Sequence, residues 1–520
     1  MVNRIIAWVI AIGIILLLIA MSLPNFIKAK NKSSEAERMA YLHTLEIQQQ
    51  REQSQYTPYG GTTLPNGESY DATFYENYGT NPFVATEDER FSTFGMDVDT
   101  ASYVIGRRYV TDGNLPDPDS VRVEEYINYF HQEYPEPQAG DIFSINIEGA
   151  ESEFGRPNYH LMRIGIKAAS ISEFRPSANM IFCVDVSGSM AREDRLEQVK
   201  VSLNDLVREM KADDQIGLVV YGTNGQVVCD LTSNHDQILR AVNGLRPSGS
   251  TYAEQGLNLA YDMARRNFDP EKINRIILCS DGVANVGFTD PDAILERVRA
   301  DAVDGISLTT IGFGMGNYND VLMEKLANHG DGMYYYVDSP EEASRVFSDG
   351  ASSMLLILAN DAKIQVEFNT ENVERFRLLG YENRALDTED FEDDTIDAGE
   401  VGSGQTVTAL YEVRIKDDSV NDRYDDICTV RVRFKNLMTG EIDTNERTFY
   451  VGDMVKEFNQ ASADFRFLAS VAEYAEILKD SYWAEDSSFE DVLRIADSSA
   501  DNEEQREFCQ LVRRAVYLNP

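Results

Sequence analysis

Between Asn179 and Leu358, apolar strand-like runs alternate with amphipathic helical stretches, and this alternation constrains the fold more than any other feature of the chain. The runs MIFCVDV, IGLVVYG, INRIILCSDG and SLTTIGFG are separated by segments such as LEQVKVSLNDLVREM and YAEQGLNLAYDMARR. Short apolar strands that alternate with amphipathic helices indicate a parallel sheet with helices on both faces. The pattern therefore predicts an α/β unit over residues 176–358, built on a doubly wound, mostly parallel sheet.

Strand-like alternation of apolar and polar residues flanks this unit on both sides. It occurs at Phe143 to Glu148 and Tyr159 to Lys167, and after Asn360 in KIQVEFN, RFRLLGYE, TVTALYEVRI, ICTVRVRFK and RTFYVG. We expect the earlier and later strands to pair, which would make the α/β unit an insertion within a β-sandwich. The predicted units are an N-terminal region at 91–175, the α/β unit at 176–358, the sandwich strands at 359–455 and a helical segment at 456–520.

The N-terminus contains a 23-residue uncharged stretch, Ile5 to Ile27, rich in Ile, Leu, Ala and Val. A helix of this length can span a hydrocarbon core of about 30 Å, and no convincing signal-peptide cleavage site follows. Residues 5–27 are therefore predicted to form a retained, single-pass transmembrane helix. Residues 28–50 are polar and helix-compatible, and residues 51–90 contain Gly, Pro, Asn and Tyr without periodicity. Residues 28–90 are therefore predicted to form a stalk or linker.

The side of the membrane on which the body lies depends on two opposing signals. Lys28, Lys30 and Lys32 follow the apolar stretch, and the positive-inside rule alone would place the body in the cytoplasm. The segment MSLPNFIKAKNK, however, resembles type IV pilins and pseudopilins, which export a basic flank of this kind, although the pilin cleavage signature is absent. We therefore expect an extracytoplasmic body, in the periplasm or at the cell surface.

Charge and cysteine usage exclude several classes of function. The chain has 88 acidic and 47 Lys or Arg residues, and its net charge of −41 repels nucleic acid, so no nucleic-acid partner is expected. Five scattered cysteines do not form a disulfide framework, and Cys183 and Cys279 lie in apolar runs typical of buried free thiols. The five histidines show no spacing suited to zinc.

Oxygen-bearing side chains follow the first strand of the α/β unit. Asp185 ends the apolar run, and Ser187 and Ser189 come next at one-residue gaps. One carboxylate and two hydroxyls are hard ligands that suit Mg²⁺ or Mn²⁺. Because serine is uncharged, such an ion keeps much of its positive charge and can attract a carboxylate from outside.

Two further loops carry residues of the same chemistry. Thr251 offers a hydroxyl between a strand and a helix, and Asp281 ends a second buried strand. In open α/β sheets, ligands bind at the carboxyl ends of strands near the point where the strand order reverses. The alternative interpretation is structural: Asp185 would cap the next helix, and Asp281 with Gly282 would form a turn.

Asp-x-Ser-x-Ser, a Thr and an Asp on three loops resemble the metal-ion-dependent adhesion site (MIDAS) of von Willebrand factor A (vWA) domains. Several stretches, among them FGMDVDTASYVIGRRYVTDGNLPDPDSVRVEEYINYF and TIGFGMGNYNDVLMEKLANHGDGMYYYVD, also resemble bacterial vWA proteins of the YfbK type over about residues 91–520. The resemblance implies a non-enzymatic protein that binds Mg²⁺, or Mn²⁺ or Ca²⁺. In that family the hydroxyls bind the ion directly and the acids often bind it through water. The implied metal residues are Asp185, Ser187, Ser189, Thr251 and Asp281.

The resulting hypothesis is adhesion or scaffolding, in which an Asp or Glu of a partner protein completes the coordination of the ion. One alternative is a pilin-like or secretion-associated structural component with a vWA tip. Another is a metal-dependent hydrolase, which is disfavoured because no G-x-S-x-G motif occurs and no His lies near Ser187 or Ser189 in sequence.

Two remaining features have open interpretations. The carboxylates from Asp387 to Glu400 could bind Ca²⁺, but they lack the spacing and glycine of a calcium loop, so a solvated acidic loop is favoured. The last helix of the α/β unit, predicted at Pro340 to Leu358, leads directly into the C-terminal strands. A shift of this helix would transmit occupancy of the metal site to those strands.

Overall fold

The computed structural model describes residues 75–154, 158–171, 175–281, 291–314, 318–416 and 423–518. The predicted membrane helix at 5–27 and residues 28–74 of the predicted stalk lie outside these ranges. Within the described ranges, no helix has both the length and the apolar character needed to cross a membrane.

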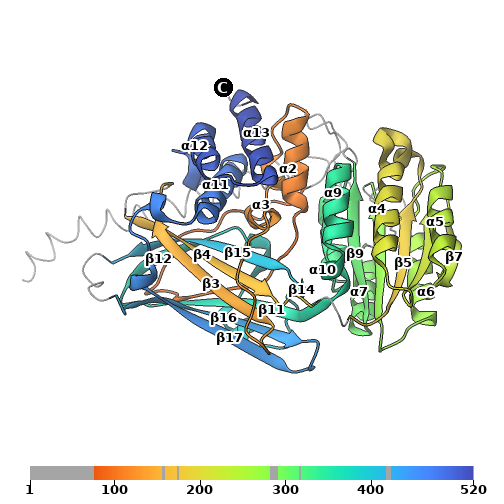
Figure 1. Cartoon of the computed structure of the whole chain (residues 1–520), viewed down its shortest axis with the longest axis horizontal. Helices are drawn as coiled ribbons and strands as arrows, with labels where there is room; N and C mark the ends of the chain where they lie inside the picture. The colour runs from red at the N-terminus through yellow and green to blue at the C-terminus, as the bar shows by residue number, and fades with distance from the viewer. Residues whose placement is uncertain are drawn as a thin grey trace, which may run out of the picture. The chain divides into compact units, whose positions relative to one another are not determined.

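The α/β unit is built on a six-stranded sheet with the order β10-β9-β8-β5-β6-β7 (Figure 1). Its neighbouring strands pair in parallel, except that the edge strand β7 runs antiparallel to β6. The predicted mostly parallel sheet is therefore confirmed. The strands are β5 (Ala178–Asp185), β6 (Gln215–Tyr221), β7 (Gly225–Thr232), β8 (Ile273–Ser280), β9 (Ile306–Phe313) and β10 (Tyr334–Val337).

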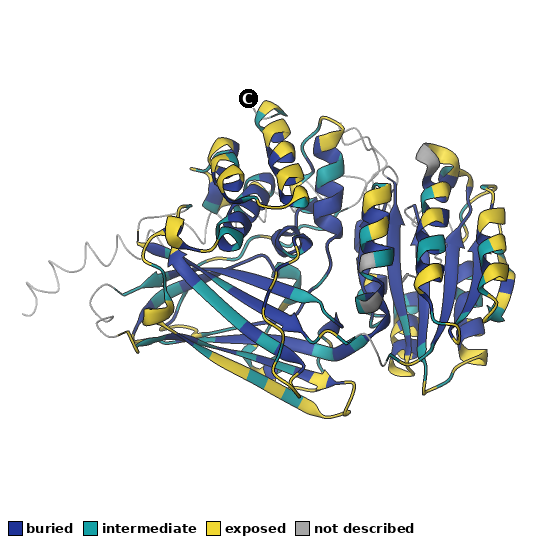
Figure 2. Cartoon of the chain, in the orientation of Figure 1, coloured by how far each residue is buried: buried dark blue, intermediate teal, exposed yellow. Residues whose placement is uncertain are grey.

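Helices cover both faces of this sheet because successive strand residues point to opposite faces. Phe182 and Val184 of β5 share a core with α4, α5 and α10 (Ala351–Leu355), whereas Ile181 and Cys183 share one with α6, α7 and α8. Figure 2 shows the inner strands of this sheet as buried, whereas the edge strand β7 is mostly half-buried or exposed. All five cysteines are buried and free, as predicted for Cys183 and Cys279. The helices are α4 (Arg195–Glu209), α5 (His235–Gly244), α6 (Ala253–Arg266), α7 (Pro291–Val303) and α8 (Asp320–Asn328).

The last helical segment of the α/β unit differs from the prediction. Instead of one helix from Pro340 to Leu358, the chain forms α9 (Pro340–Ser344), a π-helical turn and α10 (Ala351–Leu355). Strand β11 (Ile357–Phe368) then begins two residues after α10 ends. The apolar run LLIL suits helix and strand equally, and its end becomes a strand because β11 pairs with three other strands.

Two antiparallel sheets, with the orders β1-β12-β15-β4-β3 and β13-β2-β11-β16-β17, form the sandwich. Each contains strands from both sides of the α/β unit, and β4 pairs with β15, so the expected pairing is confirmed. The rings of Phe143 and Phe434, one from each sheet, lie 4.7 Å apart. The strands are β1 (Val84–Ala85), β2 (Phe91–Gly95), β3 (Phe143–Glu151), β4 (Tyr159–Ala168), β12 (Val373–Leu379), β13 (Ala385–Leu386), β14 (Gly399–Gly402), β15 (Thr406–Ile415), β16 (Asp426–Asn436) and β17 (Ile442–Tyr450).

Helices from the two ends of the described chain pack together (Figure 1). Phe130, just after α3, contacts Phe467 of α11 and Phe508 of α13, with ring centroids 5.0 and 5.5 Å apart. The helical character predicted for the C-terminal segment is confirmed. These helices are α2 (Ala101–Thr111), α3 (Val123–Tyr129), α11 (Ala463–Leu478), α12 (Phe489–Ser499) and α13 (Glu503–Leu518).

Buried ion pairs connect α2 and the segment leading into α3 with the α/β unit. Arg107 of α2 contacts Asp338 at 2.6 Å and Glu342 of α9 at 3.0 Å. Arg122, at the start of α3, contacts Asp320 of α8 at 2.7 Å. The guanidinium groups therefore fix the N-terminal helices against the edge of the α/β unit that carries β10.

Folded structure begins before Phe91, so the predicted stalk is too long at its C-terminal end. Strand β1 pairs with β12, and the indole Nε1 of Trp483 donates to the carbonyl oxygen of Asn81 at 3.1 Å. The ring of Phe83 lies edge-on to that of Trp483 at 5.0 Å. The aromatic residues before Phe91 show no strand or helix periodicity in the sequence. They are ordered by contacts with distant parts of the chain, such as the contact of Phe83 with Trp483.

Candidate metal centre

Asp185 lies at the carboxyl end of β5, in the middle of the sheet between β8 and β6. The loop after it turns back, so that the backbone amide of Ser187 donates to Asp185 Oδ1 at 2.7 Å. The hydroxyl oxygens of Ser187 and Ser189 lie 2.9 Å apart. The structure therefore brings these two hydroxyls together immediately beyond a buried carboxylate.

The loop that carries Thr251 lies against the loop after β5. The Ser248 amide donates to the Val186 carbonyl at 2.6 Å, and the Gly188 amide donates to the Gly249 carbonyl at 3.0 Å. Gly249 has a φ of +84°, and a Cβ atom there would lie 2.1 Å from the hydroxyl of Thr223. Only glycine fits this close approach, which holds the half-buried Thr251 at the same edge of the sheet.

Asp281 reaches this edge from the neighbouring strand. β5 and β8 are parallel with Val184 opposite Cys279, so Ser280 and Asp281 emerge beside Asp185. The side chain of Ser280 hydrogen-bonds the Asp185 carboxylate, and Asp281 acts on it electrostatically. All three loops named from the sequence thus meet at the carboxyl end of the sheet.

The environment of Asp185 favours a bound cation. Burial, followed by the nearby Asp281 carboxylate, raises the pKa of Asp185 to about 7, although hydrogen bonds from Ser187 and Ser280 oppose the shift. Asp185 Oδ2 is buried without a hydrogen-bond partner in the described part of the chain. A buried carboxylate oxygen of this kind is costly unless it is paired, and a divalent cation is a suitable partner. The residues present therefore fit a hard metal ion.

Arg195 also lies at this edge of the sheet, and the sequence alone does not predict its position there. This first residue of α4 is only 2% exposed, and its Nη1 donates to Asp281 Oδ2 at 3.0 Å. A Cβ atom on Gly314, whose φ is +79°, would lie 2.1 Å from Arg195 Nε, so glycine leaves space for the guanidinium. No pattern in the run MAREDRLEQ distinguishes this buried arginine from an ordinary charged residue at a helix start.

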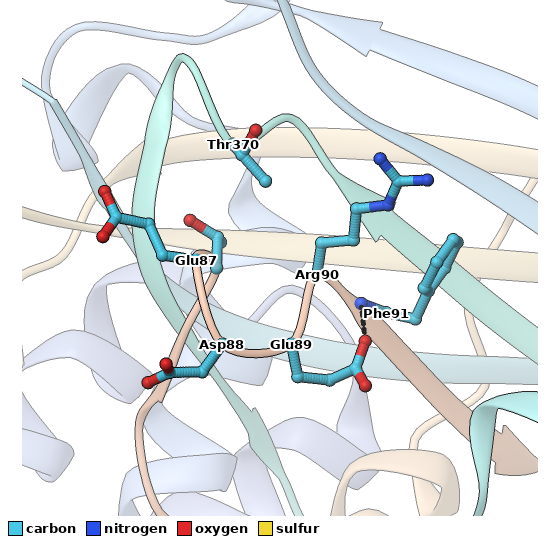
Figure 3. Close-up of a pocket in the computed structure, with 7 residues that line it drawn as sticks. Glu87, Asp88, Glu89, Arg90, Phe91 and Thr370 are labelled. Atoms are coloured by element: carbon cyan, nitrogen blue, oxygen red, sulfur yellow. Dashed lines mark hydrogen bonds between the residues drawn. The ribbon is translucent and has the colours of Figure 1, made fainter.

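A surface pocket in the sandwich is separate from these loops. It is lined by the turn between β1 and β2 and by Thr370, and Glu87, Asp88 and Glu89 surround it (Figure 3). Glu89 accepts a hydrogen bond from the Phe91 amide at 2.9 Å. The pocket contains no residue of the predicted metal site, so its acidic lining does not contribute to that site.

The doubly wound sheet and the three loops at its carboxyl edge are the features of a vWA domain. Residues 180–283 match the family model described as von Willebrand factor type A domain, and residues 69–163 match one described as von Willebrand factor. Residues 353–518 match the model described as Uncharacterized protein YfbK, C-terminal. The chain is 32% identical over 469 residues to YfbK of Escherichia coli, an alignment that covers 85% of this chain and 80% of the relative. The chain therefore belongs to the YfbK family.

Other similarities cover smaller parts or are weaker. Inter-alpha-trypsin inhibitor heavy chain H3 of Mesocricetus auratus is 31% identical over 173 residues, which is 31% of this chain and 19% of that protein. A solved structure titled von Willebrand factor type A from Catenulispora acidiphila has 13% identity and a TM-score of 0.44. It covers 74% of this chain and 91% of its own.

Proposed function

We propose that this protein binds a partner protein through a divalent cation held at the carboxyl edge of the vWA sheet. Asp185, Ser187, Ser189, Thr251 and Asp281 would hold Mg²⁺, or Mn²⁺ or Ca²⁺. The observation that carries the proposal is the buried, partnerless Oδ2 of Asp185 beside a second carboxylate and two hydroxyls. When bound, the ion supplies a positive centre that accepts a carboxylate oxygen from an Asp or Glu of the partner.

The residues around this edge prepare it for binding rather than for catalysis. Ser187 and Ser189 are neutral, so their hydroxyls contribute oxygen without cancelling the charge of the ion. Arg195 fixes one oxygen of Asp281 from the side of α4. Because Asp185 is fully buried and Asp281 nearly so, their charges act in a low dielectric, where attraction to a cation is strong.

A capture experiment tests this function. The full chain, solubilised in detergent and immobilised, would be incubated with membrane extract in Mg²⁺ or in EDTA. We expect the wild type to retain a partner only in Mg²⁺, and Asp185→Ala to retain none. Asp213→Ala is the matched control, because this exposed aspartate precedes β6 at the opposite edge of the sheet. Equal capture by Asp185→Ala in EDTA would show that the interaction does not use the metal.

We also propose that residues 5–27 anchor the protein in a membrane with the body outside the cytoplasm. The support is the 23-residue uncharged stretch and the pilin-like segment after it. A chain that lacks residues 1–32 should move from the membrane pellet to the soluble fraction. Release of the full chain by alkaline carbonate would contradict an integral anchor, and protection of the body from protease added to spheroplasts would contradict its orientation.

A further inference from the structure

A second group of carboxylates lies at the opposite end of the vWA unit, where it joins the sandwich. Asp331 precedes β10, whereas Asp397 and Glu400 lie just before and within β14. Each offers a carboxylate oxygen, and the three oxygens lie within 4.8 Å of one another. Figure 1 shows β14 and α10 next to β11 at this junction. We call Asp331, Asp397 and Glu400 the junction cluster.

Glu400 is the decisive member of the junction cluster. The residue is 7% exposed, and burial and nearby charges, rather than hydrogen bonds, determine the environment of its carboxylate. Its strongest electrostatic neighbours are Asp331, Asp397 and Asp361, all of them acids. A carboxylate in such surroundings stays ionised only if a cation offsets the charge of the neighbouring acids.

The backbone forces Glu400 into this position. β14 has the sequence GEVG, and a Cβ atom on Gly399 would lie 1.7 Å from the carbonyl oxygen of Met96. A Cβ atom on Gly402 would lie 2.0 Å from the carbonyl oxygen of Ser353 in α10. The strand therefore fits tightly between two backbone segments, and these segments fix the backbone position of Glu400.

Positive side chains around the cluster do not neutralise it. Within the described ranges, no Lys, Arg or His nitrogen lies within 4.0 Å of its carboxylates, and the cations that act at longer range are Arg275, Arg299, His329, Arg384 and Lys435. Burial first, and then Asp397 and Asp361, raise the pKa of Asp331 to about 6. Burial and the surrounding acids likewise raise the pKa of Glu400.

We propose that Asp331, Asp397 and Glu400 bind a divalent cation of the calcium class, which joins the vWA unit to the C-terminal strands. Two oxygens at about 2.4 Å from one Ca²⁺ ion lie at most about 4.8 Å apart, and the three oxygens of the cluster lie within this limit. Ca²⁺ prefers several carboxylates and tolerates irregular geometry. Asp397 is exposed and Asp331 half-buried, so the ion can enter from solvent and keep bound water.

This site is independent of the proposed partner-binding function, and its consequence is mechanical. Asp331 belongs to the vWA unit. Asp397 and Glu400 come after β11, β12 and β13 in the chain and belong to the C-terminal strands. The ion would fix the segment where α10 passes into β11. It would thereby hold the end of the vWA helix in one position relative to the sandwich.

Calorimetric titration of Ca²⁺ into the detergent-solubilised full chain tests the proposal. We expect Glu400→Gln and Asp331→Asn to weaken one class of Ca²⁺ binding by about tenfold or more. Glu389→Gln, an exposed change in the same acidic run, should leave it unchanged. Asp185→Ala should also leave it unchanged, because that residue lies at the other edge of the sheet.

Thermal unfolding in EDTA separates loss of the ion from loss of the fold. Without metal, Glu400→Gln should melt at the same temperature as the wild type or higher, because one of the repelling charges is removed. Added Ca²⁺ should raise the melting temperature of the wild type more than that of the variant, which keeps only the site at Asp185. Unchanged Ca²⁺ affinity in Glu400→Gln, or loss of all Ca²⁺ binding in Asp185→Ala, would overturn the site.

Discussion

The guanidinium of Arg195 and the carboxylate of Asp281 form a buried ion pair, with Nη1 and Oδ2 3.0 Å apart, at the edge where the proposed metal site lies. The two side chains are 3% and 7% exposed, so neither charge is solvated by bulk water. The pair links the first turn of α4 to the end of β8. Arg195 thus provides the positive charge next to Asp281, and the Oδ2 atom of Asp185 remains without one.

Loss of Arg195 should destabilise the protein and increase its dependence on metal. Arg195→Gln leaves Asp281 buried without its cation, and in EDTA we expect unfolding to require about 3 kcal/mol less free energy. Mg²⁺ should restore more stability to this variant than to the wild type. Denaturant unfolding with and without Mg²⁺ measures both effects. Arg195→Lys keeps the positive charge and should lose less unfolding free energy than Arg195→Gln. An equal loss in both variants would show that the packing of the side chain, and not its charge, stabilises the protein.

Metal binding should depend on pH through Asp185, whose pKa burial and Asp281 raise to about 7. The folded state binds the proton more tightly than the unfolded state, so this group contributes stability below the unfolded pKa of about 3.9. That contribution declines as the pH rises and is lost above about pH 7, whereas affinity for Mg²⁺ increases over the same interval. Calorimetry in buffers of different ionisation enthalpy should detect proton release at about pH 6. No proton release there would contradict the raised pKa.

Arg107 should contribute far more to stability than its neighbour Arg108. Arg107→Ala removes the arginine partner of Asp338 and one of the two arginine partners of Glu342, and we expect a loss of about 3 kcal/mol. Arg108→Ala is the matched control, because its partly exposed pair with Asp112 is worth about 0.5 kcal/mol or less. Denaturant unfolding of both variants makes the comparison. Similar losses in the two would show that the contact between α2 and α9 is not a strong one.

The same contact predicts an acid-sensitive step. Although burial opposes it, Arg345 and Arg107 hold the pKa of Glu342 below its ordinary value. Stability from this group is therefore present above the unfolded pKa of about 4.3 and is lost as the pH falls through the lower folded pKa. Acid unfolding followed by circular dichroism should begin at a higher pH in Arg107→Ala than in the wild type. An identical acid transition would contradict this role.

Residues before Phe91 should stabilise the sandwich. The ring of Phe83 contacts those of Trp483 and Tyr159, each at 5.0 Å between centroids. Phe83→Ala should lower the free energy of unfolding by about 1 to 2 kcal/mol, because the ring is half-buried. Pro82 is the exposed neighbour of Phe83 and offers the control. Pro82→Ala should change the free energy of unfolding by less than about 0.5 kcal/mol. If Phe83→Ala has the same free energy of unfolding as the wild type, the result would support a stalk that extends to residue 90.

The sequence predicts that Asp185 and Asp281 lie at one edge of the sheet, because each follows an uninterrupted apolar strand and parallel strands place their carboxyl ends together. It does not predict the burial of Arg195, which depends on the space beside Gly314, far away in the chain. Glu400 belongs to an acidic run that is typical of a solvated loop. Its burial follows from the contacts of Gly399 and Gly402 with Met96 and Ser353, which no local pattern reveals.

In the segment from Pro340 to Ile357, the local sequence pattern does not predict where the helix ends and the strand begins. Its helical periodicity is real, but the π-helical turn and the change to β11 depend on pairing with strands that come much earlier and later. The sequence likewise places residues 75–90 in the stalk, because the partners of their aromatic side chains come from distant parts of the chain. Local patterns therefore place the strand ends correctly and misplace the boundaries between units.

Anomalous diffraction from crystals soaked in Mn²⁺ tests the central claim most directly, because it locates the ion. We predict a peak at the carboxyl edge of the vWA sheet, about 2.0 to 2.2 Å from the hydroxyl oxygens of Ser187 and Ser189, and no such peak in Asp185→Ala. Full occupancy elsewhere, with no density between the loops of Asp185, Thr251 and Asp281, would contradict the account.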